Sequence, residues 1–176
     1  QINDDWSYTG MLENSQDFKD NAGKENTSFQ RAYVEGKLGG LNVTAGRYNA
    51  FFANGNVYDT RADGVEVSYG SKVKVNGFAG KAADGLALGA GLGTDFDFEG
   101  GNYAGAELSA NLNKLNVAGG YVNFKDIAKG SVLNDTTVVP EGIDDAIWYV
   151  GADYNFDGNV ALSAMYLKGD ASYNDV

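Results

Sequence analysis

The chain has 176 residues, a formal net charge of −11, and neither His nor Cys. These features exclude a disulfide framework, a thiolate metal site and a Ser-His-Asp triad, and the negative charge opposes binding to nucleic-acid phosphates. No run of about 18 apolar residues occurs, so the sequence predicts no membrane-spanning helix.

Apolar and polar residues alternate along most of the chain, and this period of two predicts β-strands. In the second predicted strand, for example, Ala32 and Val34 share one face, whereas Arg31 and Glu35 share the other. Nine strands are expected, over residues 5–14, 29–38, 41–48, 61–69, 73–79, 102–112, 115–124, 145–156 and 160–166.

The connections between these strands are alternately short and long. Tight turns are expected at Gly39-Gly40, Gly70-Ser71, Asn113-Lys114 and Asp157-Gly158. Long polar joints are expected over residues 15–27, 49–60, 80–101 and 125–144. Short turns at one end and long loops at the other are typical of a transmembrane β-barrel, in which a closed antiparallel sheet pairs every backbone polar group.

The segment Gly80–Gly101 allows two interpretations. Its middle, Leu86–Leu92, alternates large and small residues and could form a further strand. We interpret the segment as one long loop that joins the fifth strand directly to the sixth, because only then does Asn113-Lys114 fall on the side of the short turns.

Seven charged residues of the predicted strands share the polar parity, as the lumen face of a barrel requires: Arg31, Glu35, Lys37, Glu66, Lys74, Glu107 and Asp153. A charge misplaced onto lipid at the bilayer midplane would cost about 2–4 kcal/mol. The alternative is a soluble sandwich with one face in water, which also alternates. The residues expected to face lipid are Val34, Val43, Val67, Val75, Leu108, Val150 and Leu162.

Aromatic residues favour the barrel over the sandwich. Tyr69, Tyr154 and Phe156 precede short turns, and Trp148 and Tyr166 lie near the long loops, so outward aromatics are expected near both rims. The predicted fold is an all-β, antiparallel up-and-down transmembrane barrel with one domain over residues 1–176. Because single-chain bacterial barrels have even strand numbers, nine strands indicate part of a larger barrel, or a count that is off by one.

Two segments carry a family resemblance. The sequence RAYVEGKLGGLNVTAGRYNAFFANGNVYDTRADGVEVSYG, at 31–70, and AELSANLNKLNVAGGYVNFKD, at 106–126, resemble the OmpM-type outer-membrane porins of diderm Firmicutes (Negativicutes). The resemblance implies a homotrimeric general diffusion porin in a bacterial outer membrane, surrounded by lipid and lipopolysaccharide. It also implies that any tether to peptidoglycan would use a domain outside these residues.

A passive channel requires no catalyst and no cofactor, so we expect neither. In porins of this kind the third long loop narrows the pore, which would bring Asp95, Asp97 and Glu99 opposite basic residues of the barrel wall. The same carboxylates resemble a weak Ca²⁺ cluster, but they lack EF-hand spacing and no metal is expected. The alternative function is a small structural or adhesive barrel without a conducting pore.

The candidate site residues form two groups. The predicted constriction consists of Asp95, Asp97, Glu99, Arg31, Arg47, Arg61 and Lys74. The predicted lumen face adds Glu35, Lys37, Glu66, Glu107 and Asp153. Arg47 has the apolar parity of its strand, so its place in the constriction requires a β-bulge or a strand end.

Overall fold

A computed structural model of the chain describes residues 1–16, 25–82, 101–127, 132–133, 137–138, 142–156 and 160–173. These residues form an all-β structure with one short 3₁₀ turn, η1 (Ala53–Gly55). The main sheet has nine strands, and β8 and β9 form a separate two-stranded sheet. The strands are β1 (Trp6–Gln16), β2 (Glu25–Leu38), β3 (Leu41–Phe52), β4 (Tyr58–Gly70), β5 (Val73–Ala82), β6 (Asn102–Leu112), β7 (Leu115–Ile127), β8 (Val132–Leu133), β9 (Thr137–Val138), β10 (Ile143–Asn155) and β11 (Ala161–Tyr173).

The nine-stranded sheet is antiparallel throughout and runs up and down in the order of the sequence, apart from β8 and β9. This confirms the predicted strand number and connectivity of the main sheet. In particular, β5 pairs directly with β6, as the interpretation of the segment after Gly80 requires. The interior of that segment, 83–100, lies outside the described residues.

All four predicted long joints are shorter than expected because the flanking strands continue into them. At the predicted joint 15–27, β1 extends to Gln16 and β2 starts at Glu25, and at 80–101 β5 extends to Ala82. The predicted loop 49–60 shrinks to 53–57, since β3 and β4 stay paired as far as Phe52 and Tyr58. At the predicted loop 125–144, β7 extends to Ile127 and β10 starts at Ile143.

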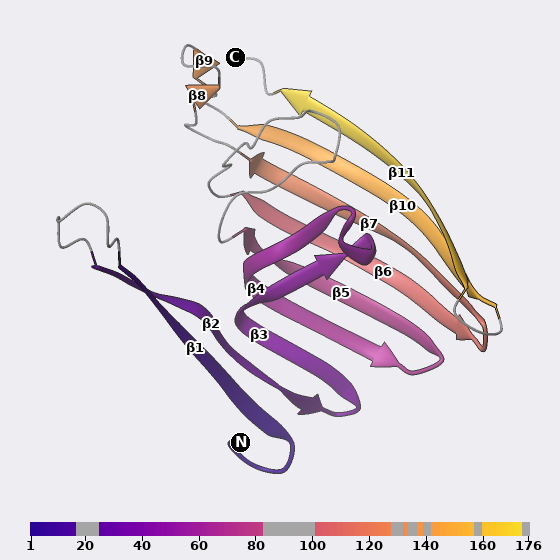
Figure 1. The fold of residues 1–176 in the computed structure, drawn as a ribbon, viewed down its shortest axis with the longest axis horizontal. Coiled ribbons are helices and arrows are strands. Elements are labelled where there is room, and N and C mark those ends of the chain that lie inside the picture. The colour runs from indigo at the N-terminus through magenta and orange to yellow at the C-terminus, as the bar shows by residue number, and fades with distance from the viewer. Residues whose placement is uncertain are drawn as a thin grey trace.

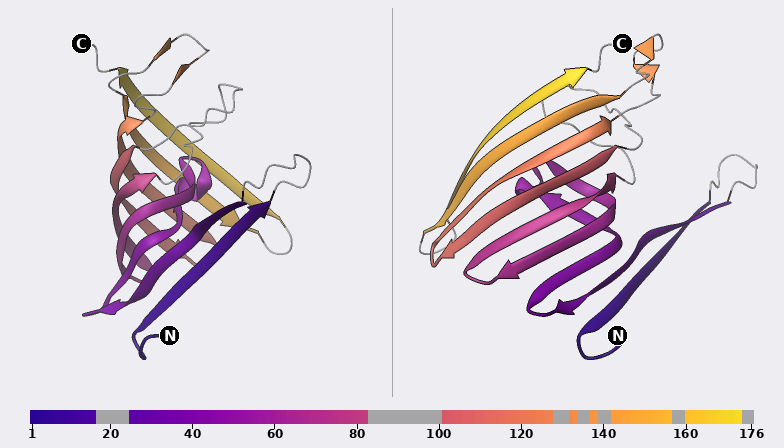
Figure 2. Two further views of the ribbon diagram at one scale, coloured as in Figure 1. Left: turned by 90° about the vertical axis from the view of Figure 1, so that its left-hand side faces the viewer. Right: turned by 180° about the vertical axis from the view of Figure 1, so that it is seen from behind.

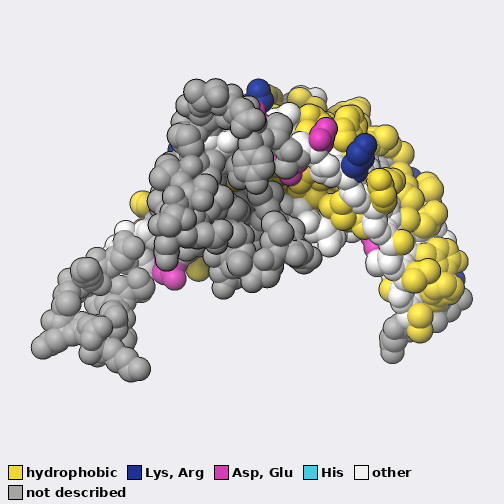
Figure 3. Space-filling model, turned by 90° about the horizontal axis from the view of Figure 1, so that it is seen from above, with side chains coloured by type: hydrophobic (Ala, Val, Ile, Leu, Met, Phe, Trp, Pro, Cys, Tyr) yellow, Lys and Arg dark blue, Asp and Glu magenta, His cyan; other side chains and the backbone are white. Residues whose placement is uncertain are grey.

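The sheet is strongly curved, with one concave and one convex face (Figures 1 and 2). Its two edges are β1 and β11, which do not pair with each other among the described residues. The described strands therefore form an open arch, which is evident from above in Figure 3. There is no second sheet stacked on it, as a sandwich would have; the described part of the chain adds only the pair β8–β9.

The distal ends of β3 and β4 leave the arch and fold over its concave face, carrying η1 with them (Figures 1 and 2). We call residues 49–60 the inward hairpin. Its rings pack on aromatic residues of the wall: Phe52 stacks on Phe78 with ring centroids 3.9 Å apart, and Tyr58 stacks on Phe124 at 6.3 Å. The core of the protein is therefore one-sided and lies between the hairpin and the upper concave face. Its buried hydrophobic residues are Tyr48, Ala50, Phe52, Ala53, Val57, Tyr58, Ala62, Phe78, Ala82, Tyr103, Val122, Phe124, Ile127 and Tyr149.

Glycines on the concave face make room for these rings. A Cβ atom added to Gly120 would lie 2.5 Å from Cζ of Tyr149, and one added to Gly105 would lie 2.5 Å from Cε2 of Phe78. Such distances are too short for any real contact, so each ring can lie flat only over a residue without a side chain. In contrast, Gly77 on the convex face has no atom within 4 Å of the corresponding position.

This difference predicts opposite results for two Gly→Val substitutions in neighbouring parts of the sheet. Gly120→Val should displace the Tyr149 ring and lower the free energy of unfolding by about 1–3 kcal/mol, as other overpacked sites do. Gly77→Val, the matched control, should change it by less than about 0.5 kcal/mol. Urea unfolding of the protein refolded in detergent measures both. Equal effects would mean that the Tyr149 ring has room to move.

Candidate functional site

The concave face carries a group of charged side chains at the end of the arch where the short turns lie. Strand alternation places them on the same side as buried residues: on β4, for example, Glu66 lies between the buried Ala62 and Ser68. On the same basis, the charged residues of this face include Arg31, Glu35, Lys37, Glu66, Lys74, Glu107 and Asp153. These seven residues share one face, as their parity in the sequence predicted.

The tip of the inward hairpin has a strained backbone. Ala53, Asn54 and Gly55 follow one another with φ values of 54°, 52° and 81°. The left-handed conformation is natural for Gly and tolerated by Asn, but it is unfavourable for Ala. Because such strain persists only where the surroundings hold it, the tip is a candidate functional element.

Two amide side chains fasten this tip across the concave face. Nδ2 of Asn54 donates to Oδ2 of Asp153 on β10 at 3.3 Å, and Nδ2 of Asn56 lies 3.4 Å from Sδ of Met165 on β11. Nδ2 of Asn56 also donates to the carbonyl of Ala53 at 2.9 Å, which closes the turn on itself. The inward hairpin therefore reaches from β3 and β4 to β10 and β11 on the other side of the arch.

A cavity of about 280 Å³ with several charged residues in its lining lies beside the hairpin tip. Lys72 and Lys74 line it on the side of β5, and Asp153 lines it on the side of β10. Glu107 of β6 also lines it, and its Oε2 accepts a hydrogen bond from the Tyr149 hydroxyl at 2.6 Å. The cavity thus has charges of both signs at fixed positions.

A second cavity, of about 240 Å³, lies near the other edge of the arch. Arg31 and Glu35 of β2 line it together with Glu66 of β4. Oε1 of Glu66 accepts a hydrogen bond of 2.8 Å from Nδ2 of Asn76. The concave face is therefore hydrophilic on both sides of the aromatic core.

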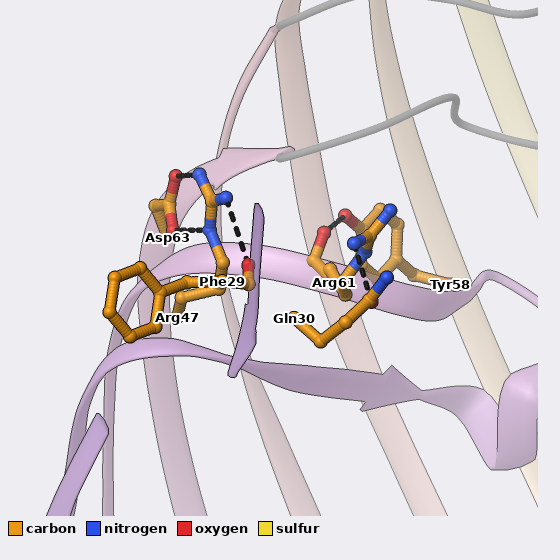
Figure 4. A network of polar contacts seen from close by, with 6 residues as sticks. All are labelled: Phe29, Gln30, Arg47, Tyr58, Arg61 and Asp63. Atoms are coloured by element: carbon orange, nitrogen blue, oxygen red, sulfur yellow. Dashed lines mark hydrogen bonds and ion pairs between the residues drawn. The ribbon is translucent and has the colours of Figure 1, made fainter. Parts of the chain in front are cut away.

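Arg47 lies on the opposite, convex face. Its Nε and Nη2 donate to the two carboxylate oxygens of Asp63, both at 2.7 Å, and Nη1 donates to the carbonyl of Phe29 (Figure 4). No bulge occurs at Arg47: the β3–β4 ladder runs past this residue without a register shift, and the β2–β3 ladder ends at its pair with Ala32. Arg47 therefore keeps its apolar parity, and a bidentate ion pair stabilises it there.

Arg61 lies where the inward hairpin leaves the sheet. Its Nη1 donates to Oε1 of Gln30, and its carbonyl accepts a hydrogen bond from the Tyr58 hydroxyl (Figure 4). Arg61 is thus placed at the base of the hairpin, away from the cavity that Lys74 lines. The remaining residues of the predicted constriction, Asp95, Asp97 and Glu99, lie outside the described residues.

The convex face is an apolar band with a polar border. Large exposed side chains cover it, including Tyr69, Leu108, Val150 and Leu162, each more than half exposed. Figure 3 shows hydrophobic side chains gathered along the outer side of the arch. One hydrogen-bonded row of residues limits the band towards the long connections: Arg47, Asp63, Lys81, Asn102 and Lys125.

On β11 this border lies nearer the short turns than it does on β3 to β7. Counted from the short turns, the first charged convex residue on β4 is Asp63. On β11 it is Lys168, which belongs to the hydrogen-bonded row of Val67. Val67 follows Asp63 by four residues, so the border descends by two rows across the sheet.

Aromatic pairs lie near both limits of the band. Tyr121 and Trp148 pair near the polar border with ring centroids 4.4 Å apart. Tyr154 and Phe156 pair at the end with the short turns, 4.8 Å apart. Trp148, Tyr154 and Phe156 are among the outward aromatics that the sequence predicted at the two rims, whereas Tyr121 was not predicted.

The residues that sequence reasoning missed are those of the hairpin tip, Asn54 and Asn56, and the ring that positions Glu107, Tyr149. The sequence Ala53-Asn54-Gly55-Asn56 contains an Asn-Gly pair, which is a strong signal for a tight turn with left-handed residues. That signal predicts the turn itself. The inward direction of the turn depends on Phe52 and Tyr58 finding aromatic partners on distant strands.

The two amide contacts predict that the hairpin tip can be loosened without unfolding the sheet. Each hydrogen bond contributes about 0.5–1.5 kcal/mol, so combining Asn54→Ala with Asn56→Ala should speed amide hydrogen exchange at residues 53–57 about tenfold. Exchange in β6 and β7 should stay unchanged. Asn42→Ala, at the opposite end of β3, is the control. If exchange at the tip stayed as slow as in the parent chain, the aromatic core alone would hold it.

Within the described ranges, no helix has the length and apolar character needed to cross a membrane. The same residues contain no cluster of three or more Asp or Glu side chains suited to a metal ion. No protein-family model matches the chain, and a comparison with curated proteins finds no significant match.

Proposed function

We propose that this chain forms the wall of an outer-membrane porin of the OmpM type, a water-filled channel for passive diffusion of small polar solutes and ions. The observation that carries the proposal is the contrast between the two faces of one curved sheet. The convex face is an apolar band with a polar border, and the concave face carries charges, cavities with charged linings and an inward hairpin.

The apolar band supports a position in a lipid bilayer. Leu108, Val150 and Leu162 are 56%, 58% and 63% exposed, and they lie on neighbouring parts of the same face. Soluble monomers rarely expose a continuous apolar surface of this extent. In a bilayer it would contact lipid tails, while the antiparallel ladders pair the backbone polar groups within the sheet.

The width of the arch supports a channel over a plugged barrel. An eight-stranded barrel closes with an interior that its own side chains fill. Here nine strands still form an open arch, so a barrel that contained them would be wider than that. The second candidate function, a structural or adhesive barrel, draws support from the inward hairpin, which covers part of the concave face.

The expected surroundings follow from the resemblance to OmpM-type porins. Lipid and lipopolysaccharide of the outer membrane would contact the convex band, and three copies would assemble as a homotrimer. A peptidoglycan tether would belong to a domain outside these residues. The proposed channel acts without catalysis or a cofactor.

Membrane insertion predicts that the cost of a new charge depends on depth. Val150 lies in the middle of the convex band on β10, between Tyr154 and Ala146, so Val150→Arg should reduce stability in phospholipid vesicles by about 2–4 kcal/mol. Asn102→Arg, in the polar border row of the same face, should cost about 0–1 kcal/mol. Denaturant unfolding in vesicles measures both. A soluble sheet would tolerate both arginines equally.

Channel function predicts stepwise currents from the protein reconstituted in a planar bilayer. Replacing residues 52–58 by a short turn should raise single-channel conductance about twofold or more, because the inward hairpin narrows the passage. Changing Asp95, Asp97 and Glu99 together to Asn or Gln tests the other candidate constriction, and should shift the reversal potential towards anions if those carboxylates reach the lumen. A reconstituted protein that gives no steps would favour the structural barrel.

A further inference from the structure

The cavity beside the hairpin tip has a basic side and an acidic side. The basic side is Lys72 and Lys74, at the turn before β5 and at its start. The acidic side includes Asp153 of β10, whose Oδ2 accepts a hydrogen bond from Asn54 of the hairpin tip. Between them lie Glu107 and a floor of mostly small or amide side chains, including Ala118, Gly151, Asn111 and Asn116.

The register fixes the spacing of the two sides. Lys74 pairs with Ser109, Ser109 with Ala118, and Ala118 with Gly151, so a single hydrogen-bonded row leads from β5 to β10. Neighbouring strands lie about 4.8 Å apart, which puts the two outer backbones of this row about 14 Å apart. Asp153 follows Gly151 by two residues on the same face. The charged groups project from both sides into the space above small residues.

We propose that this cavity binds small zwitterions, with the carboxylate of the solute at Lys72 and Lys74 and its ammonium group at Asp153. The proposal rests on the porin function and names the class of solute that the channel would retain. A solute with both charges satisfies both sides at once, whereas an ion with one charge leaves the opposite side without a partner. Interactions between charges are also stronger in a confined cavity than in bulk water.

The hairpin supports this assignment because it limits the cavity from above. The Asn54 amide contacts Asp153 directly and so holds the acidic side chain in place. Glu107 is held by the Tyr149 hydroxyl in the same way. A site whose charged groups are positioned before the ligand arrives loses less entropy on binding.

Binding can be measured without a membrane, on the full chain refolded in detergent, by isothermal titration calorimetry at low salt. The probes are glycine, β-alanine and γ-aminobutyrate, which carry the same two charges at increasing separation. Propanoate and propylammonium carry one charge each. We expect one of the zwitterions to bind at least about tenfold more tightly than either single-charge ion. Equal affinities for zwitterions and single-charge ions would overturn the proposal.

Substitutions on the two sides give distinct expectations. Lys74→Met should weaken zwitterion binding about tenfold and weaken propanoate more than propylammonium, whereas Asp153→Asn should do the reverse. The matched controls are Lys168→Met and Asp170→Asn on the convex face of β11, which should leave binding unchanged. Circular dichroism checks that every variant keeps its sheet. If the controls weakened binding as much as Lys74→Met and Asp153→Asn, the charges of this cavity would not be the binding groups.

Conductance in a planar bilayer tests the porin function, whereas calorimetry in detergent tests the zwitterion site, so the two proposals can fail independently. A chain that conducts without preferring zwitterions would be a porin that lacks this site. A chain that binds zwitterions in detergent and gives no current in a bilayer would keep the site and lose the channel function.

Discussion

The alternation of side chains between the two faces of one antiparallel sheet is the constraint on which the rest of this structure depends. A register shift of a single residue would exchange the two faces of a strand. From β3 to the β6–β7 ladder the pairing is continuous, without any shift among the described pairs. The exposed apolar band therefore stays on the convex side, and the aromatic core and the charged side chains near the short turns stay on the concave side.

The inward hairpin departs from the wall without breaking this alternation. Its even-numbered residues, such as Phe52 and Tyr58, stay on the core side and pack on wall aromatics. The wall accommodates those rings by placing glycines opposite them, as Gly120 does for Tyr149. One periodicity thus produces an apolar exterior, a one-sided aromatic core and a charged cavity beside the hairpin tip.

The alternation of apolar and polar residues predicts this fold well, because the sequence of each strand is enough to identify which residues share a face. The bounds of β6 agree with the predicted strand residue for residue, and its turn at Asn113-Lys114 marks the next strand. Loop lengths were harder to predict, since residues 49–52 remain paired in β3 only because Tyr58 to Arg61 offer them a partner strand. Local composition carries no signal for such long-range pairing.

The candidate site was predictable only in part, for a related reason. Parity alone placed Lys74, Glu107 and Asp153 on one face, but it could not show that Asn54 reaches Asp153 from 99 residues away along the chain. For Arg47, the sequence showed a charge with apolar parity, and a bulge was the natural explanation. The structure instead places Asp63 opposite Arg47 in the ladder. The Arg47 side chain therefore stays on the convex face, where the Asp63 carboxylate neutralises its charge.

The two free edges carry a consequence for assembly. Eight antiparallel steps separate β1 from β11, so the two edge strands point in the same direction. Joining them directly would create a parallel seam, and so would joining two such arches around a common axis. Closure with antiparallel pairs alone requires an odd number of additional strands, which makes the complete count even. In the proposed barrel, strand direction therefore restricts which polypeptide can complete the ring.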